Sequence, residues 1–153
     1  MSVVGAIYKA PIIYCLSDEK NGTYSVNIQY DNRVFTGNAK LSENDKGFFS
    51  VIVGKTIALS KARIKAIKYE IKKSQNEFKY RNDFYQEVIK YGQESPAFVD
   101  PTGSFRKAIY RITERISSLQ KALKQEKSNL NAYLENQEKA LSIVRNFREG
   151  NTN

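Results

Sequence analysis

The side chains most able to do chemistry lie in one stretch, VDPTGSFRKAIYRITER, which covers residues 99–115. Its basic residues follow directly after a turn sequence and are Arg106, Lys107, Arg111 and Arg115. Cations at the start of a helix oppose the helix dipole, whereas a bound anion is favoured there by free backbone N–H groups and by arginine side chains. Because Lys107, Arg111 and Arg115 are spaced by four residues, they form one stripe on a helix. The stretch therefore predicts a phosphate site at a helix start.

A purely structural interpretation of this stretch also remains open. Ser104 or Thr102 can cap the helix by accepting a backbone N–H, and the turn itself needs no ligand. Asp83 and Glu87 lie on a segment that we expect to face this helix start, so they can form salt bridges with its arginines.

Aromatic side chains cluster in a second stretch, FKYRNDFYQEVIKYG, which covers residues 78–92. They include Phe84 and Tyr85, close to the polar Asn82. In an antiparallel helical hairpin this stretch lies beside the basic helix start. Rings that stack on a base and arginines that bind phosphates are the elements of a nucleotide pocket, although aromatic side chains also pack ordinary helix interfaces. The two clusters together predict a ligand site at this end of the hairpin.

The composition removes the usual means of catalysis. The chain has no histidine and one cysteine, Cys15, which excludes a Ser/His/Asp triad, a Cys/His dyad and a histidine-ligated metal. The sequence GKT at 54–56 suggests a P-loop, but Phe49 occupies the position where that motif requires a glycine. Catalysis through carboxylates, lysine or tyrosine remains open, but the carboxylates Glu70, Glu77 and Glu87 are scattered along helical surface and form no convincing acid/base pair. We expect a protein that is not an enzyme and that needs no cofactor.

The first third of the chain predicts a small antiparallel sheet. Four segments are rich in β-branched and aromatic residues, namely 10–16, 23–30, 33–41 and 47–54. In the second segment, Tyr24, Val26, Ile28 and Tyr30 alternate with polar residues and form one face. Asp31 and Asn32, between the second and third segments, predict a tight hairpin.

The rest of the chain predicts a long helical hairpin. Apolar residues recur at steps of three and four in 56–91 and again in 104–147, with Thr56 as the candidate N-cap of the first helix. Glu126 and Gln137 interrupt the apolar stripe of the second helix. The segment between them contains two prolines and forms a connecting loop of about a dozen residues, so we expect the two helices to pack antiparallel.

These elements give an α+β fold, with a β domain at 1–54, a helical hairpin at 55–148 and a disordered tail at 149–153. A two-helix hairpin cannot bury a full core by itself, so the sheet or another chain must cover the remainder. The second helix outruns the first, and both apolar stripes have polar gaps. These features favour a homo-oligomer, a dimer or larger, over a monomer with frayed helix ends.

The net charge of +9 is concentrated on the two helices. Residues 54–91 carry ten basic and four acidic side chains, and residues 103–153 carry ten and five. Such surfaces attract nucleic acids and phosphorylated ligands, unless they are only solvated lysine-rich helix faces. The N-terminus lacks the features of a signal peptide, and no window is apolar enough to span a bilayer. We expect a cytoplasmic protein with no membrane partner.

The order of these parts resembles a known family. The segment VIVGKTIALSKARIKAIKYEIK, residues 51–72, leads from the β domain into the first helix, and a proline-containing turn leads into the arginine-rich second helix. This arrangement is similar to that of the Thoeris anti-defence sponge proteins of bacteriophages. The resemblance implies a non-enzymatic oligomer in the host cytoplasm. Its ligand would be a cyclic ADP-ribose isomer made by a bacterial immune sensor, and some members also hold cyclic oligonucleotides.

The resemblance also implies roles for single residues. The positions that it assigns to the ligand pocket are Arg111, Arg115, Phe84 or Tyr85, Asp100 or Thr102, and Arg63. Arg111 and Arg115 would be the paired helix arginines, and Phe84 or Tyr85 would be the stacking aromatic. Asp100 or Thr102 would be the polar group of the loop, and Arg63 the arginine at the junction of sheet and helix. Asp100 departs from this pattern, because a carboxylate beside a pyrophosphate is unfavourable unless it binds ribose hydroxyls instead.

Three functions follow from these features. The first is sequestration of a cyclic nucleotide signal without cleavage. The second is a basic helical module that binds nucleic acid or inhibits a host protein, through Lys61, Lys65, Lys68 and Lys72. The third is a structural coiled-coil component that only self-assembles. The clustered residues and the resemblance together favour the first.

Overall fold

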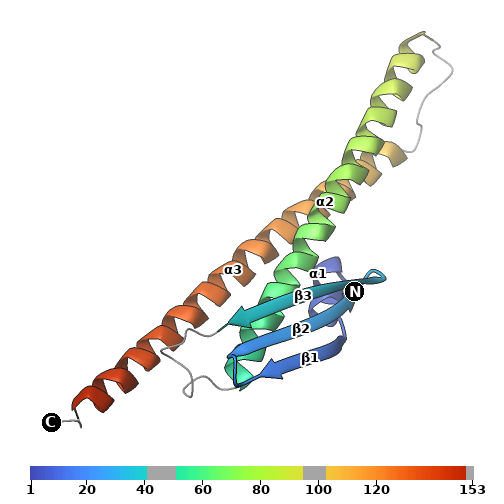
Figure 1. Ribbon diagram of the computed structural model, residues 1–153. Helices are drawn as coiled ribbons and strands as arrows, with labels where there is room; N and C mark the ends of the chain where they lie inside the picture. Colours follow the sequence, from blue (N-terminus) through green and yellow to red (C-terminus); the bar gives the residue numbers. More distant parts are fainter. Residues whose placement is uncertain (41–50, 95–102, 151–153) are drawn as a thin grey trace.

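The computed structural model describes residues 1–40, 51–94 and 103–150. It shows a short helix and three strands followed by two long helices (Figure 1). The elements are α1 (Val3–Tyr8), β1 (Ile12–Asp18), β2 (Thr23–Tyr30), β3 (Arg33–Lys40), α2 (Val51–Glu94) and α3 (Ser104–Gly150). The predicted α+β fold, an antiparallel sheet followed by a helical hairpin, is confirmed.

The sheet is antiparallel and has the strand order β1-β2-β3. β2 and β3 form the predicted tight hairpin, in which Tyr30 pairs with Arg33 across a two-residue turn. The turn residues Asp31 and Asn32 have positive φ angles of 51° and 55°. A two-residue hairpin turn favours such angles, and Asp and Asn adopt them more readily than other non-glycine residues. The turn sequence therefore sets the register of the hairpin.

One face of the sheet is covered by α2 (Figure 1). Tyr24, Val26 and Ile28 of β2 are buried on this face, each at most 2% exposed. Their alternation with more exposed polar residues is typical of a strand with one face on the core. On α2, Ala58 and Ala62 are fully buried. Small side chains at these positions allow the helix backbone to approach the sheet closely.

The two long helices pack against each other and run antiparallel, as predicted (Figure 1). Ile67 of α2 and Leu119 of α3 are fully buried in the same core cluster as the sheet residues. Both helices extend beyond the sheet. The end of α2 and the start of α3 project on one side, and the last turns of α3 project on the other.

The boundaries of α2 differ from the prediction. Residues 51–54 form the first turn of α2, whereas the sequence predicted that they end a fourth strand. The prediction was wrong because so short an apolar run fits a strand and a buried helix equally well. Residues 47–50 lie outside the described part of the chain. Thr56 is therefore not an N-cap, and its Oγ1 instead donates a hydrogen bond to the carbonyl of Ile52 at 2.7 Å. At the other end α2 continues past position 91 and through Gly92, since a glycine costs a helix only about 1 kcal/mol.

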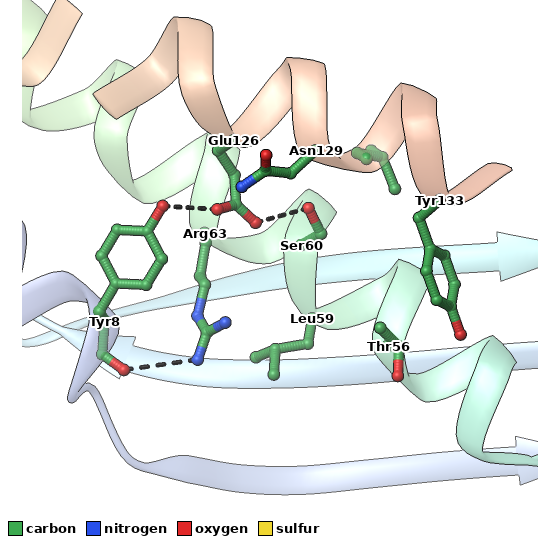
Figure 2. A pocket seen from close by; sticks show the side chains of 9 residues that line it. Tyr8, Thr56, Leu59, Ser60, Arg63, Glu126, Asn129 and Tyr133 are labelled. Atoms are coloured by element: carbon green, nitrogen blue, oxygen red, sulfur yellow. Dashed lines mark hydrogen bonds between the residues drawn. The ribbon is translucent and has the colours of Figure 1, made fainter. Parts of the chain in front are cut away.

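The N-terminal helix α1 was not predicted from the sequence pattern. It begins after Ser2, whose hydroxyl accepts a hydrogen bond from the Gly5 N–H at 3.0 Å. Ile7 is fully buried, and Arg63 of α2 donates a hydrogen bond to the carbonyl of Tyr8 at 3.4 Å (Figure 2). These contacts seat α1 against the helical hairpin.

The C-terminal helix α3 begins at Ser104, as predicted, and runs to Gly150. Residues 149 and 150 of the expected tail are therefore helical, and 151–153 lie outside the described residues. Among the described helices, none carries an apolar run long enough to cross a membrane.

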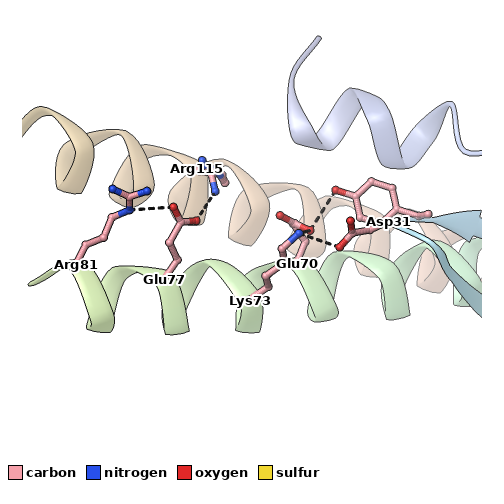
Figure 3. A network of polar contacts seen from close by, with 7 residues as sticks. Asp31, Glu70, Lys73, Glu77, Arg81 and Arg115 are labelled. Atoms are coloured by element: carbon pink, nitrogen blue, oxygen red, sulfur yellow. Dashed lines mark hydrogen bonds and ion pairs between the residues drawn. The ribbon is translucent and has the colours of Figure 1, made fainter.

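A polar network ties the β2–β3 turn to α2 (Figure 3). Asp31 Oδ2 accepts hydrogen bonds from Lys73 Nζ at 2.8 Å and from the Tyr69 hydroxyl at 2.9 Å. These bonds hold the pKa of Asp31 below its usual value. Nearby, the hydroxyl of Tyr30 donates to the buried Glu70 at 3.2 Å. The network fixes the end of the sheet on the helix.

Gly37 sets the distance between β3 and α2. A Cβ at this position would lie 1.7 Å from the carbonyl oxygen of Ala58 and 2.6 Å from the backbone nitrogen of Ala62. Because helix backbone cannot rotate away as a flexible side chain can, Gly37→Ala must push α2 off the sheet. We expect urea titration to show a loss of about 3 kcal/mol in the free energy of unfolding, at the upper end of ordinary overpacking effects.

The matched control is Gly150→Ala. A Cβ at Gly150 meets no atom within 4 Å, so this substitution should change the free energy of unfolding by less than about 1 kcal/mol. If Gly37→Ala proves as stable as the control, the close approach of helix and strand is wrong.

Candidate functional site

The predicted aromatic and basic clusters lie side by side where α2 ends and α3 begins. Arg106 Nε donates a hydrogen bond to the hydroxyl of Tyr85 at 2.8 Å. The ring centroid of Phe105 lies 5.5 Å from that of Phe84 and 6.1 Å from that of Tyr85. Asn82 is half-buried on the same turns of α2. These residues form a packed helix end in which one predicted arginine is already hydrogen-bonded.

Arg115 forms a salt bridge within the hairpin. Its Nη1 lies 3.0 Å from Glu77 Oε2, and Glu77 Oε1 accepts a hydrogen bond from Arg81 Nε at 3.1 Å (Figure 3). A salt bridge was one of the two interpretations of this arginine, but Asp83 and Glu87 were the wrong partners. The antiparallel packing of the helices brings Glu77 opposite Arg115 instead.

The described part of this predicted site leaves its remaining basic side chains in solvent. Lys107 and Arg111 are exposed, and Asp100 and Thr102 lie outside the described residues. A hollow of about 190 Å³ lies beside the cluster and is lined by Tyr80, Arg81, Phe84, Phe105 and Ala108. Since ligand pockets usually exceed roughly 300 Å³, this hollow is small for a nucleotide.

Arg63 lies in a different part of the molecule. It precedes Glu77 by fourteen residues on α2, which corresponds to about 20 Å along a helix. The predicted site residues therefore divide into two groups, one at the far end of the hairpin and Arg63 near the sheet.

Arg63 lines a larger hollow, which we call the junction pocket because α1, α2 and α3 meet there (Figure 2). Its volume is about 370 Å³, within the range of small-molecule sites. Its lining residues are Tyr8, Thr56, Leu59, Ser60, Arg63, Glu126, Asn129, Leu130 and Tyr133. The pocket combines a carboxylate, a guanidinium and two tyrosine rings.

Glu126 is a buried carboxylate in this pocket and is 7% exposed. Its two oxygens accept hydrogen bonds from the hydroxyl of Tyr8 at 2.5 Å and from the hydroxyl of Ser60 at 2.6 Å (Figure 2). Both donors are neutral, and within the described chain no lysine or arginine lies at ion-pair distance from Glu126. A buried negative charge without a cation is costly, so this carboxylate needs its hydrogen bonds.

The environment of Tyr8 keeps its hydroxyl protonated. Burial, the hydrogen bond to Glu126 and the negative charge of Glu126 raise the pKa of Tyr8 to about 12, and Arg63 opposes this shift. At neutral pH the hydroxyl is therefore a hydrogen-bond donor and not a base.

Arg63 carries the positive charge of the pocket. Its guanidinium carbon lies 5.1 Å from the centroid of the Tyr8 ring, and it makes one hydrogen bond, to the Tyr8 carbonyl. In the described part of the chain it has no acidic partner. Most of its N–H donors are thus available to an anion at the pocket.

Sequence reasoning identified Arg63 but missed Tyr8, Ser60, Glu126 and Tyr133. Tyr8 and Glu126 are separated by 118 positions, so their contact leaves no local pattern. One visible signal was Glu126 itself, because it occupies a position of the α3 apolar stripe where a core residue is expected.

No protein-family model, curated protein or solved structure matches this chain.

In the ranges 1–40, 51–94 and 103–150, no cluster of Cys, Asp and Glu side chains is arranged to hold a metal ion.

The raised pKa of Tyr8 predicts a pH-dependent part of the stability. The folded chain holds this proton up to about pH 12, whereas the unfolded chain releases it near the ordinary pKa of 10.0. The stabilisation is therefore complete below pH 10 and is lost as the pH rises towards 12. In Tyr8→Phe, the free energy of unfolding should fall less steeply over this range than in the wild type, as measured by urea titration at a series of pH values.

Tyr110→Phe serves as the control, because Tyr110 is 65% exposed. This variant should keep the wild-type slope. Equal slopes for Tyr8→Phe, Tyr110→Phe and the wild type would contradict the coupling between Tyr8 and Glu126.

Proposed function

We propose that this protein binds a cyclic nucleotide signal in the junction pocket and holds it without cleaving it. The observation that carries the proposal is that one positively charged and one negatively charged side chain line the same pocket. The guanidinium of Arg63 and the buried carboxylate of Glu126 both line a hollow of about 370 Å³, and each lacks an ionic partner in the described chain.

These groups match the parts of a nucleotide. An arginine with unused N–H donors suits a phosphate, which it can bind through two parallel hydrogen bonds. A carboxylate accepts hydrogen bonds from ribose hydroxyls, and Glu126 retains lone pairs beyond the two that Tyr8 and Ser60 use. The rings of Tyr8 and Tyr133 provide apolar faces for a base.

The same groups support binding without turnover. A general acid or base works best with a pKa near the operating pH, whereas the pKa of Tyr8 is raised to about 12. We therefore propose a sequestering protein and not an enzyme.

The nature of the ligand is proposed from the resemblance to the Thoeris anti-defence sponge family. On this basis the ligand is a cyclic ADP-ribose isomer, and the biological role is evasion by a bacteriophage of a host immune signal in the host cytoplasm. The α+β architecture with a long helical hairpin is compatible with this role.

Binding should depend on Arg63 and not on Arg111. Titration calorimetry with cyclic ADP-ribose isomers should show binding to the wild type. In Arg63→Ala the affinity should fall roughly 100-fold, because alanine cannot donate charge-assisted hydrogen bonds to a phosphate. Arg63→Lys keeps the charge but not the paired donors, and should fall between the two. Chromatography should recover the ligand unchanged.

Arg111→Ala is the matched control, because Arg111 is exposed at the far end of the hairpin and should not affect binding. If Arg111→Ala removes binding and Arg63→Ala does not, the site lies in the aromatic–arginine cluster instead. If no cyclic nucleotide binds the wild type, the proposed function is wrong.

A row of lysines on α2 favours a second candidate function, nucleic-acid binding. Its members Lys61, Lys65, Lys68 and Lys72 are exposed and lie on one helix face. Beside the row is another hollow of about 370 Å³, lined by Arg33, Tyr69, Lys72, Lys73 and Asn76. The guanidinium carbon of Arg33 lies 4.8 Å from the centroid of the Tyr69 ring. Such a surface suits contacts with a phosphate backbone.

If nucleic acid binds along this row, its affinity must fall steeply with salt. The measurement is fluorescence anisotropy with a labelled duplex at several salt concentrations, which gives the slope of log affinity against log salt. In the triple variant Lys61→Ala/Lys68→Ala/Lys72→Ala this slope should be smaller in magnitude by roughly three, because each removed lysine leaves one phosphate without its cation. The variant Lys121→Ala/Lys124→Ala/Lys127→Ala removes the same charge from exposed positions on α3 and should keep the wild-type slope. Equal slopes for the two variants would exclude the α2 row as the contact surface.

A further inference from the structure

The face of the sheet opposite α2, which we call the outer face, carries side chains that the core does not use. Residues of β2 alternate between the two faces, so Asn27 lies on the face opposite to the buried Val26 and Ile28. Directly paired residues of neighbouring antiparallel strands share a face. The register therefore places on the outer face a row of Leu16, Ser25 and Asn38, a row of Tyr14, Asn27 and Thr36, and a pair of Gln29 and Val34. Figure 1 shows α2 crossing behind the sheet, with no described helix in front of it.

The outer face is neutral although water reaches it. On the described strands its charged residues are Asp18 and Lys40, which both lie beside Thr23 in the row at one end of the sheet. Charged residues make up 27% of the chain, a share that is usual for a protein surface in water. A nucleic acid needs cations that neutralise its phosphates, so a face without them does not suit a nucleic acid.

The polar groups of the outer face are amides and hydroxyls that the described part of the chain leaves largely unused. Asn38 Oδ1 accepts a hydrogen bond from the Ser25 hydroxyl at 2.6 Å, and its Nδ2 group remains a donor. The amide of Gln29 and the hydroxyl of Thr36 have no hydrogen-bond partner among the described residues. These groups are therefore available to a ligand.

The amide of Asn27 lies between them and is incompletely satisfied. Its Oδ1 is buried and has no hydrogen-bond partner among the described residues. A buried acceptor without a donor is costly. Because the χ2 angle of an amide side chain is broad, a rotation about it would bring this oxygen to the surface, where a ligand hydroxyl can donate to it.

Tyr14 adds an aromatic surface beside these polar groups. It is 54% exposed and pairs with Asn27 across β1 and β2. Leu16 and Val34, 47% and 53% exposed, lie at the two margins of the polar groups. The outer face therefore combines an exposed ring with amides and hydroxyls, and it carries no charge inside its end row.

We propose that the outer face binds a neutral oligosaccharide. A sugar ring has an apolar C–H surface, which packs on an aromatic ring such as that of Tyr14. Its hydroxyls both donate and accept hydrogen bonds, and each side-chain amide offers two donors and an acceptor in one plane. None of these contacts requires a charge. The proposal uses no residue of the junction pocket and does not depend on the ligand of that pocket.

A protein partner is the rival occupant. The buried centre of a protein interface is mainly apolar and aromatic. The centre of the outer face instead consists of Ser25, Asn27 and Thr36 beside a single tyrosine. In a dry interface each of these polar groups would need a partner of its own, whereas sugar hydroxyls supply such partners along their whole chain.

NMR spectra of the full chain labelled with nitrogen-15 test the proposal. Soluble cello-oligosaccharides and chito-oligosaccharides serve as probes, because the first carry only hydroxyls and the second also carry N-acetyl groups. The side-chain amide signals of Asn27, Gln29 and Asn38 should shift with at least one probe at concentrations up to about 1 mM. The probe that shifts them at the lower concentration identifies the class of sugar.

Variants of the outer face should weaken this binding while circular dichroism and melting temperature stay unchanged, because the substituted side chains are exposed. Tyr14→Ala should lower the affinity roughly tenfold through loss of the ring contact. Gln29→Ala and Asn38→Ala should each lower it roughly fivefold through loss of a hydrogen bond.

The matched controls are Tyr110→Ala and Gln120→Ala, which remove an exposed ring and an exposed amide from α3 and should bind the probe as the wild type does. Arg63→Ala should also keep sugar binding, which separates this proposal from the proposed function of the junction pocket.

Three results would overturn the proposal. The first is the absence of shifts with both probes, which would leave the outer face to a protein partner. The second is binding that weakens steeply with salt, since a neutral ligand makes no ionic contact. The third is an affinity unchanged by the variants at Tyr14, Gln29 and Asn38, which would locate the sugar elsewhere.

Discussion

The close approach of α2 to β3 at Gly37 is the contact on which the other contacts depend. There is no room for a single methyl group between the glycine and the helix backbone at Ala58 and Ala62. This contact seats α2 on the sheet, and α1 and α3 must then pack along the sides of α2. The junction pocket lies where the three helices meet, so its position follows from the seating of α2.

Glu126 is the side chain that links this packing to the proposed function. A leucine at this position of the α3 apolar stripe would bury apolar surface. A buried carboxylate without a cation instead has to be stabilised by hydrogen bonds, here from Tyr8 and Ser60. A residue that breaks a local rule in this way is typical of a functional site. Together with Arg63 it gives the pocket two opposite charges, and this supports the proposal that the ligand carries both an anion and hydrogen-bond donors.

Local patterns were enough to predict most of the fold. The alternation of Tyr24, Val26 and Ile28 and the Asp31-Asn32 turn predicted the hairpin, and the apolar stripes predicted both long helices and their antiparallel packing. What local patterns could not supply were contacts decided by tertiary structure. The partner of Arg115 depends on how far the two helices slide past each other, and the junction pocket depends on Tyr8 and Glu126, which are 118 positions apart. The short apolar run at 51–54 was ambiguous for a different reason, because it is too short to show a period.

The central proposal is that the junction pocket retains a cyclic nucleotide intact. The most direct measurement is to mix the purified chain with a lysate that contains cyclic nucleotide signals, isolate the protein, denature it by heat and identify the released small molecules by mass spectrometry. We expect release of an unaltered cyclic nucleotide, in an amount close to one molecule for each pocket. Release of no nucleotide, or of a ring-opened product, would contradict it.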